Sequence, residues 1–221
     1  MRTIYSPNAV RDGCVLHLDA ANPKSYLGTG TTWFDLSGNA NDGTITSSPI
    51  HNSGSFTFDG IDDYIVVNNS PELNNTNITI ICWARSNTLL WNSHGMLVSK
   101  RDVFVLHPNA DSTNVGCYCY IGGAWANASI NFVPNITAYN MYAYSWDGTN
   151  ILSYLNGSLS NSRAVAGSIA LDDTGGISIG RDDSIGRYLN GDISIVQIYN
   201  RALSAQEVAQ NFEAMRGRYG I

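Results

Sequence analysis

Apolar and polar residues alternate along much of this chain with the period of two that β-strands show, most clearly in residues 55–67, SFTFDGIDDYIVV. Phe56 and Phe58 share one face before an Asp-Gly turn. Tyr64 and Val66 repeat that spacing after the turn. Alternation on both sides of an Asp-Gly turn is typical of paired antiparallel strands. We therefore expect a hairpin here, with the rest of the fold built around it.

Further segments with strand patterns are separated by turn residues. Residues 78–85, ITIICWAR, form a nearly continuous apolar run, as expected for a central strand covered on both faces. Asp147-Gly148 and Asn156-Gly157 predict two hairpin turns, because Gly, Asn and Asp tolerate the positive φ that such turns need. The other predicted strands begin or lie at residues 15–18, 44–45, 96–100, 103–106, 115–121, 141–146, 150–155, 176–180 and 193–199.

One helix is predicted near the end of the chain. Ser204 is a candidate N-cap and Glu207 follows three residues later, which is the spacing of a capping box. Val208 and Phe212 then fall on one helical face. We expect a helix over about 204–216 that lies against the sheet edge.

Many short strands with regular turns and one terminal helix predict an all-β fold, a two-sheet antiparallel sandwich. The length of 221 residues suits one large β domain. Residues 1–12 show no periodicity and are expected to form an N-terminal arm, whereas 13–221 form the domain, including the helix.

Composition narrows the function classes. The net charge is −6 and the Lys and Arg residues are not clustered, which argues against nucleic-acid binding because that relies on neutralised phosphates. The first ten residues, MRTIYSPNAV, lack the apolar run of a signal peptide, and no stretch has transmembrane length. We expect a protein made in a cytoplasm without membrane insertion, either soluble there or assembled into something larger.

The four cysteines, Cys14, Cys82, Cys117 and Cys119, are expected to be free thiols. Cys117 and Cys119 share one face of a predicted strand. A lone C-x-C without a second ligand pair is weak as a zinc signal. Core thiols are the favoured interpretation.

Three spaced segments resemble a known family. They are residues 13–44 (GCVLHLDAANPKSYLGTGTTWFDLSGNANDGT), 54–65 (GSFTFDGIDDYI) and 189–212 (LNGDISIVQIYNRALSAQEVAQNF). They resemble laminin-G-like jelly-roll domains of the concanavalin A-like lectin/glucanase superfamily, especially those in structural proteins of tailed bacteriophages. The resemblance implies a jelly-roll sandwich that is used for adhesion or carbohydrate binding and often holds a structural calcium. Residues 86–138, where specificity loops are expected, match no motif of the family.

Glycoside hydrolysis has little support in the sequence. Glucanases with this fold are known for two glutamates and an aspartate alternating on one strand, and retaining chemistry needs two carboxyl groups about 5 Å apart. The chain has only Glu72, Glu207 and Glu213, of which two belong to the predicted helix and one to a loop. No other nucleophile motif is present. We expect no enzyme activity.

Aspartates gather at several predicted turns and offer the oxygen ligands that calcium prefers. Asp35 lies in one such turn, and Asp59 and Asp62 lie in another. Asp19 and Asp192 flank strands that the resembled fold brings together. These residues are candidate ligands of a structural Ca²⁺. The alternative is that they only form turns, by accepting hydrogen bonds from their own backbone.

Sugar recognition needs an exposed aromatic face with polar neighbours, because the apolar face of a sugar stacks while its hydroxyls form hydrogen bonds. Trp91 and Trp125 lie in loop-like surroundings and are the stacking candidates, with Asn92, His94 and Asn127 as polar partners. Their alternative role is to anchor loops or to contact another protein. The remaining tryptophans are expected to be packed: Trp33, Trp83 and Trp146.

Together these features favour a non-catalytic, lectin-like structural protein on the surface of a phage virion, as a head decoration or fibre component. Its expected partners are the capsid or other virion proteins, further copies of itself, and host or environmental glycans. One alternative is a carbohydrate-binding adhesin module, and another is a glycoside hydrolase.

Overall fold

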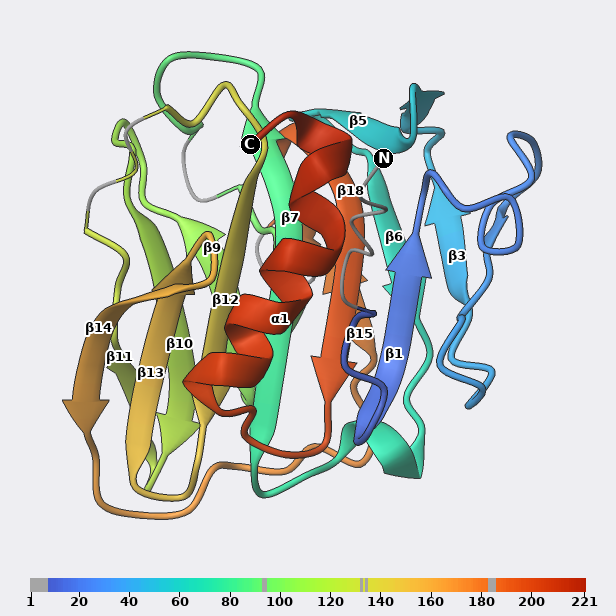
Figure 1. Ribbon diagram of the computed structural model, residues 1–221. Helices are drawn as coiled ribbons and strands as arrows, with labels where there is room; N and C mark the ends of the chain where they lie inside the picture. Colours follow the sequence, from blue (N-terminus) through green and yellow to red (C-terminus); the bar gives the residue numbers. More distant parts are fainter. Residues whose placement is uncertain (1–7, 93–94, 132, 134, 183–185) are drawn as a thin grey trace, which may run out of the picture.

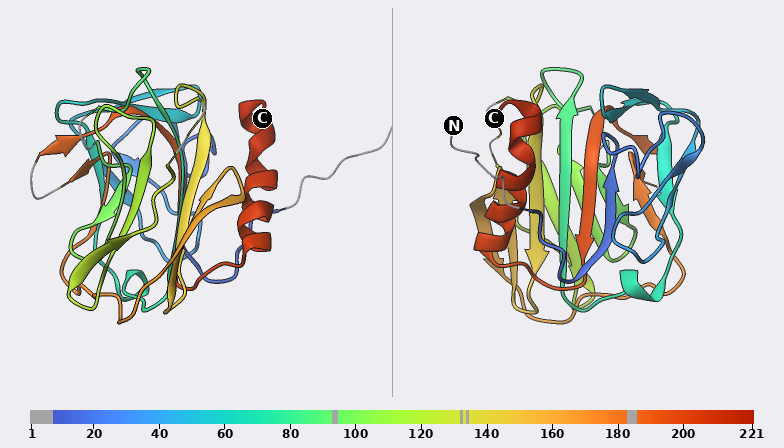
Figure 2. Two further views of the ribbon diagram at one scale, coloured as in Figure 1. Left: turned by 90° about the vertical axis from the view of Figure 1, so that its left-hand side faces the viewer. Right: turned by 45° about the vertical axis from the view of Figure 1, so that its right-hand side comes forward.

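The computed structural model of the protein describes residues 8–92, 95–131, 133, 135–182 and 186–221. Over these residues the chain forms two eight-stranded antiparallel sheets, packed face to face, and a separate two-stranded ribbon (Figures 1 and 2). The expected all-β sandwich of jelly-roll type is confirmed. No helix in the described part of the chain is long and apolar enough to cross a membrane.

We call the first sheet sheet A. Its strands are β1 (Cys14–Asp19), β4 (Ile50–Asn52), β5 (Ser55–Asp59), β7 (Ile78–Ser86), β12 (Asn140–Trp146), β13 (Asn150–Leu155), β14 (Ser158–Ala164) and β18 (Asn190–Tyr199). Their order is β14-β13-β12-β7-β18-β5-β4, and β1 also pairs with β18.

The second sheet is sheet B, and it has the order β11-β10-β9-β8-β15-β6-β3-β2. Its strands are β2 (Thr32–Trp33), β3 (Gly43–Thr46), β6 (Tyr64–Val67), β8 (Val98–Lys100), β9 (Phe104–Pro108), β10 (Val115–Ile121), β11 (Ala124–Asn127) and β15 (Ile177–Ile179). The ribbon pairs β16 (Arg181–Asp182) with β17 (Arg187–Tyr188), and the helical elements are η1 (Pro71–Leu73), α1 (Ala205–Met215) and η2 (Arg216–Tyr219).

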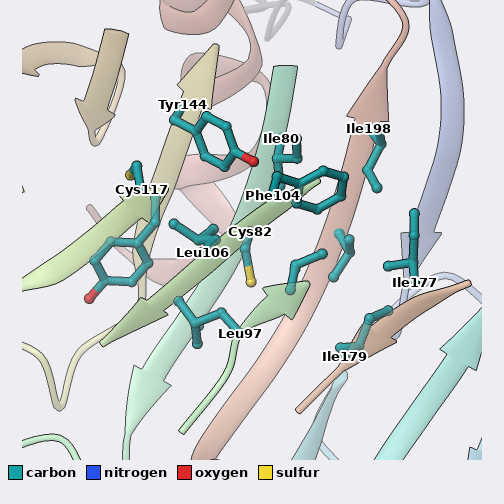
Figure 3. Close-up of a cluster of buried hydrophobic side chains, with 14 of the residues drawn as sticks. Ile80, Cys82, Leu97, Phe104, Leu106, Cys117, Tyr144, Ile177, Ile179 and Ile198 are labelled. Atoms are coloured by element: carbon teal, nitrogen blue, oxygen red, sulfur yellow. The ribbon is translucent and has the colours of Figure 1, made fainter. Parts of the chain in front are cut away.

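Alternation along the strands builds the core between the two sheets (Figure 3). Ile80 and Cys82 of β7 point inward from sheet A, while Leu106 of β9 and Cys117 of β10 point inward from sheet B, and all four are fully buried. The free cysteines of this layer therefore behave as small apolar side chains, as expected.

The predicted hairpin in residues 55–67 is wrong. β5 pairs with β18 and β4 in sheet A, whereas β6 pairs with β3 and β15 in sheet B. The connection between them crosses from one sheet to the other, and Ile65 and Val67, rather than Tyr64 and Val66, face the core opposite the Phe residues of β5. A period of two in the sequence indicates which side chains share a face of a strand, but it does not indicate which strand pairs with it.

The later turns follow the prediction. β13 pairs with β12 on one side and with β14 on the other, across the two Gly-containing turns. At the second turn Asn156 has φ 50° and Gly157 has φ 78°, the two consecutive positive φ values of a type I′ turn. The apolar strand β7 lies between β12 and β18 with both faces buried, as its sequence indicates.

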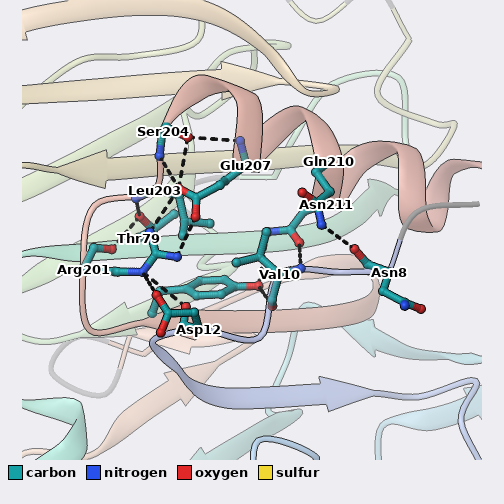
Figure 4. Close-up of polar contacts among 11 residues, drawn as sticks. Asn8, Val10, Asp12, Thr79, Arg201, Leu203, Ser204, Glu207, Gln210 and Asn211 are labelled. Carbon is teal, nitrogen blue, oxygen red and sulfur yellow. Dashed lines mark hydrogen bonds and ion pairs between the residues drawn. The ribbon is translucent and has the colours of Figure 1, made fainter.

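Helix α1 begins where predicted. The Ser204 Oγ accepts the Glu207 backbone N–H, and the Glu207 carboxylate accepts the Ser204 backbone N–H, which completes the capping box (Figure 4). Its position differs from the expectation, however. The helix lies across the outer face of sheet A rather than at its edge (Figures 1 and 2), because β7, β12 and β18 present a second set of apolar side chains there.

The described part of the N-terminal segment packs beside this helix (Figure 4). The Val10 backbone N–H donates to Asn211 Oδ1 at 2.8 Å, and the Tyr199 hydroxyl donates to the Val10 carbonyl at 3.0 Å. Gln210 Nε2 donates to the Asn8 carbonyl at 2.8 Å. Residues 8–10 are thus tied to the end of the chain by backbone and side-chain hydrogen bonds.

Candidate functional site

The outer face of sheet B carries a hollow of about 320 Å³. Strands β9, β10 and β11 form its floor, residues beside β8 form one side, and β17 contributes from the ribbon. Its lining combines aromatic, basic and amide side chains: Met96, Arg101, Val105, His107, Asn109, Tyr118, Trp125 and Arg187.

Strand alternation determines which side chains line this hollow. Cys117 and Cys119 are buried on the inner side of β10, so Tyr118 points outward. The Tyr118 ring stacks on the His107 ring of β9, with centroids 5.0 Å apart and planes 9° apart. Gly116 makes room for this ring, because a Cβ there would lie 2.3 Å from Tyr118 Cε2. The floor of the hollow is therefore a flat pair of rings.

Trp125 stands at the margin of the floor on the edge strand β11. It lies directly across from Tyr120 on β10, and the two rings meet edge to face at 5.3 Å. The Arg101 guanidinium carbon lies 6.0 Å from the Trp125 ring centroid. Trp125 is still 38% exposed, so part of its ring is open to a ligand.

The structure separates the two predicted stacking tryptophans. Trp91 is only 1% exposed and meets Tyr142 edge to face at 6.3 Å inside the core, so the prediction that its ring is available for stacking is wrong. Asn92 holds this segment down: its Nδ2 donates to the Tyr188 carbonyl at 2.7 Å and its Oδ1 accepts the Asn190 N–H at 3.0 Å. The predicted partner His94 lies outside the described residues.

Asn127 shares a face of β11 with Trp125 but does not line the hollow. Its Nδ2 donates to Ser129 Oγ at 2.9 Å, and its Oδ1 accepts from Arg163 Nη1 at 3.1 Å. The sequence interpretation missed Tyr118, although placing the neighbouring cysteines in the core already implies that Tyr118 faces outward. Arg187 carries no comparable local signal, because it reaches the hollow from the ribbon.

A second cluster of polar groups lies at the turn between β5 and β6. The carboxylate oxygens of Asp59, Asp62 and Asp63 lie within 4.8 Å of one another. Burial raises the pKa of Asp63 to about 6, and the negative charges of Asp59 and Asp62 act in the same direction. Three carboxylates held close together are a donor set that suits a hard cation such as Ca²⁺.

The other predicted metal ligands are not brought to this turn. Asp19 binds the Arg218 guanidinium through both carboxylate oxygens, at 2.7 and 3.0 Å. Asp192 pairs with Arg85 at 2.7 Å. Asp35 Oδ1 accepts the Ser37 backbone N–H of its own turn at 2.9 Å and the His17 N–H of β1 at 2.8 Å. Each of these three carboxylates therefore already has a cationic or backbone N–H partner away from the turn between β5 and β6.

In the part of the chain that the structure describes, acidic residues do not line the hollow on sheet B. Glu207 caps α1 and binds Arg201 at 2.6 Å, and the hydrogen bond from Arg201 lowers the pKa of this carboxyl to about 2. Glu213 lies on the same helix and Glu72 lies in η1. In the described residues the glutamates are therefore remote from the aromatic floor.

Residues 58–209 match the Laminin_G_3 family of the concanavalin A-like lectin/glucanases superfamily. The chain belongs to this family. No curated protein matches it in sequence.

Solved structures share the family's fold at low sequence identity. The binding domain of botulinum neurotoxin serotype D has a TM-score of 0.72 at 16% identity, over 92% of this chain and 52% of that one. A complex of that toxin's ligand-binding domain with N-acetylneuraminic acid has a TM-score of 0.70 at 17% identity, over 92% of this chain and 51% of that one. The chain thus spans about half the length of these toxin domains.

Domain 4 of AbnA, a GH43 extracellular arabinanase from Geobacillus stearothermophilus solved with arabinotriose, has a TM-score of 0.70 at 16% identity. Here the match covers 90% of this chain and 97% of that one. At these identities the likeness shows a shared fold.

Proposed function

We propose that this chain is a non-catalytic, lectin-like domain that binds glycans through the hollow on sheet B and is displayed on the surface of a phage virion. The observation that carries the binding role is the exposed ring of Trp125 beside the flat floor of Tyr118 and His107. Solved structures that share this fold include a toxin ligand-binding domain in complex with N-acetylneuraminic acid and an arabinanase domain in complex with arabinotriose, which supports the same use here.

The hollow has the chemistry that a sugar requires. A pyranose presents an apolar face of C–H groups and a rim of hydroxyls, so aromatic rings and fixed hydrogen-bonding groups must be combined. Trp125 and Tyr118 supply rings from adjacent strands, and Asn109 and the two arginines supply polar groups at the margin. Because the rings lie on sheet strands rather than loops, the surface is already shaped before a ligand arrives.

The non-catalytic assignment is supported by the lining of the hollow. Hydrolysis of a glycosidic bond needs two carboxyl groups on either side of the bond. The described residues that line the hollow include no Asp or Glu. A reducing-sugar assay on β-glucans and arabinan tests this point, and release of sugar above that of a heat-denatured sample would contradict it.

The virion setting is supported by the three sequence segments that resemble tailed-phage structural proteins. The partners would then be capsid or other virion proteins, with self-assembly as a further route to display. An antibody against the chain should label purified particles from the source culture. If the protein stays in the particle-free fraction, the second candidate, a carbohydrate-binding adhesin module, is favoured instead.

We also propose that Asp59, Asp62 and Asp63 hold a structural Ca²⁺. Their close carboxylates repel one another without a cation, and a divalent ion would remove that repulsion and stiffen the crossing between the sheets. The ion would have no part in the sheet B hollow.

A glycan array followed by calorimetry tests the binding role. We expect saturable binding that falls at least tenfold in Trp125→Ala, on the scale of about 1.4 kcal/mol for one lost aromatic contact. Phe34→Ala is the matched control, since Phe34 is 39% exposed and does not line the hollow. Equal binding by both variants, or no binding by the wild type, would contradict the proposal.

A further inference from the structure

The hollow on sheet B differs in charge from the protein that carries it. The whole chain has a net charge of −6. Among the described residues, the lining of the hollow nevertheless includes two arginines and a histidine, and no carboxylate. The hollow on sheet B is therefore a basic site on an acidic protein, and its positive charge raises the local concentration of anions.

One of the two arginines is fixed by a buried partner. Arg101 Nη1 lies 3.0 Å from Asp182 Oδ2, and the Asp182 side chain is only 1% exposed. Asp102, at 3.6 Å from Arg101 Nε, is 77% exposed and contributes little through solvent. Asp182 thus offsets most of the Arg101 charge and holds its guanidinium in place next to Trp125.

The second arginine retains its charge. Arg187 faces the hollow from β17, and in the described ranges it has no ion pair within 4.0 Å. Its neighbour across the ribbon, Asp182, already binds Arg101. A guanidinium in this setting is a fork of N–H donors that matches the two oxygens of a carboxylate.

We infer that the ligand of this hollow is an acidic saccharide, a sugar whose ring carries a carboxylate. The inference rests on the proposed glycan-binding function and adds the class of glycan. The apolar face of the sugar ring lies on Trp125 and Tyr118, and the carboxylate is held by Arg187, with Arg101 next to it. A neutral sugar leaves the Arg187 charge without a partner, so it binds more weakly.

Calorimetry with three trisaccharides of similar size tests the inference at 50 mM and 300 mM salt. The probes are a tri-galacturonate, a neutral galactotriose and a sulfated galactotriose. At low salt we expect the galacturonate to bind at least tenfold more tightly than the neutral sugar, and the difference to shrink at high salt because the attraction is screened. Sulfated sugar should bind less tightly than the galacturonate, because a sulfate ester holds its charge farther from the sugar ring than a carboxylate on the ring does, although both offer two oxygens to a guanidinium.

Two arginine variants test whether the charge of Arg187 causes the preference for the acidic sugar. Arg187→Gln should reduce the preference for the galacturonate over the neutral sugar to less than threefold. Arg216→Gln is the control, because it removes the same charge from the C-terminal end of α1, where Arg216 pairs with Glu213. It should keep the full preference.

The outcomes separate this inference from the function on which it rests. Equal or tighter binding of the neutral sugar overturns the acidic class while glycan binding stands. Tighter binding of the sulfated sugar overturns the carboxylate assignment. No binding of any sugar, with Trp125→Ala indistinguishable from the wild type on the glycan array, overturns the proposed function and this inference together.

Discussion

The outer faces of the two sheets each carry an outward-pointing tryptophan, and these two tryptophans differ in burial. Sheet A presents Trp83, which is fully buried because α1 and η2 cover it: its ring lies parallel to Phe212 at 5.7 Å and stacks on Tyr219 at 4.4 Å. Sheet B presents Trp125, which no helix of the described residues buries and which remains 38% exposed. What covers a strand, more than the strand's own sequence, decides whether an outward aromatic stabilises the fold or is available to a ligand.

The largest expected effect comes from removing the covered tryptophan. Trp83→Ala should lower the free energy of unfolding by about 3–5 kcal/mol, because it empties the space between α1, η2 and sheet A. Trp125→Ala, its counterpart on sheet B, should cost less than about 1 kcal/mol, because its ring is partly hydrated already. Chemical denaturation of both variants measures the contrast, and equal losses would contradict it.

The next effect concerns the ion pair that fastens η2 to sheet A. Arg218→Met leaves the Asp19 carboxylate, whose side chain is 4% exposed, without its cation. We expect a loss of about 1–3 kcal/mol, below the range for a fully buried pair because Arg218 is itself 35% exposed. Arg216→Met is the control at a half-exposed pair on the same element and should change stability by less than about 0.5 kcal/mol. Equal losses in the two variants would mean that burial of Asp19 does not matter.

A smaller effect on stability is expected at the N-terminus of helix α1. Ser204→Ala removes the hydroxyl that accepts the Glu207 N–H and should cost about 1 kcal/mol. Ser160→Ala, an exposed serine on β14, controls for the substitution itself. In thermal unfolding, Ser204→Ala should have a lower midpoint temperature than Ser160→Ala. A loss of stability in Ser160→Ala as large as that in Ser204→Ala would exclude the helix cap as the cause.

The sequence predicted local features of the fold well and long-range placement poorly, for a physical reason. The capping box, the apolar run of β7 and the Gly-containing turns are local patterns, and each was found where predicted. The pairing of β5 and β6 depends on long-range packing, which a period of two does not encode. Trp91 was misplaced because it lies in loop-like surroundings, yet Asn92 uses its amide to fold that segment back onto the core. Arg187 joins the hollow only through the tertiary structure.

The smallest expected effect is a pH dependence at the crossing between the two sheets. The pKa of Asp63 is about 6 in the folded protein, above its ordinary value of roughly 4, so the folded state binds more protons than the unfolded state between about pH 4 and 6. Stability should therefore fall as pH rises through that window, because burial makes ionisation of Asp63 less favourable in the folded state. Asp63→Asn should remove this dependence. Millimolar Ca²⁺ should weaken the pH dependence of the wild type, because a bound cation favours the ionised carboxylate. Denaturation at pH 4.5 and 6.5, with and without Ca²⁺, measures the pH dependence and the effect of Ca²⁺ on it. Identical changes in stability over this window in the wild type and in Asp63→Asn, without Ca²⁺, would contradict the raised pKa, and a profile that Ca²⁺ leaves unchanged would contradict only the metal proposal.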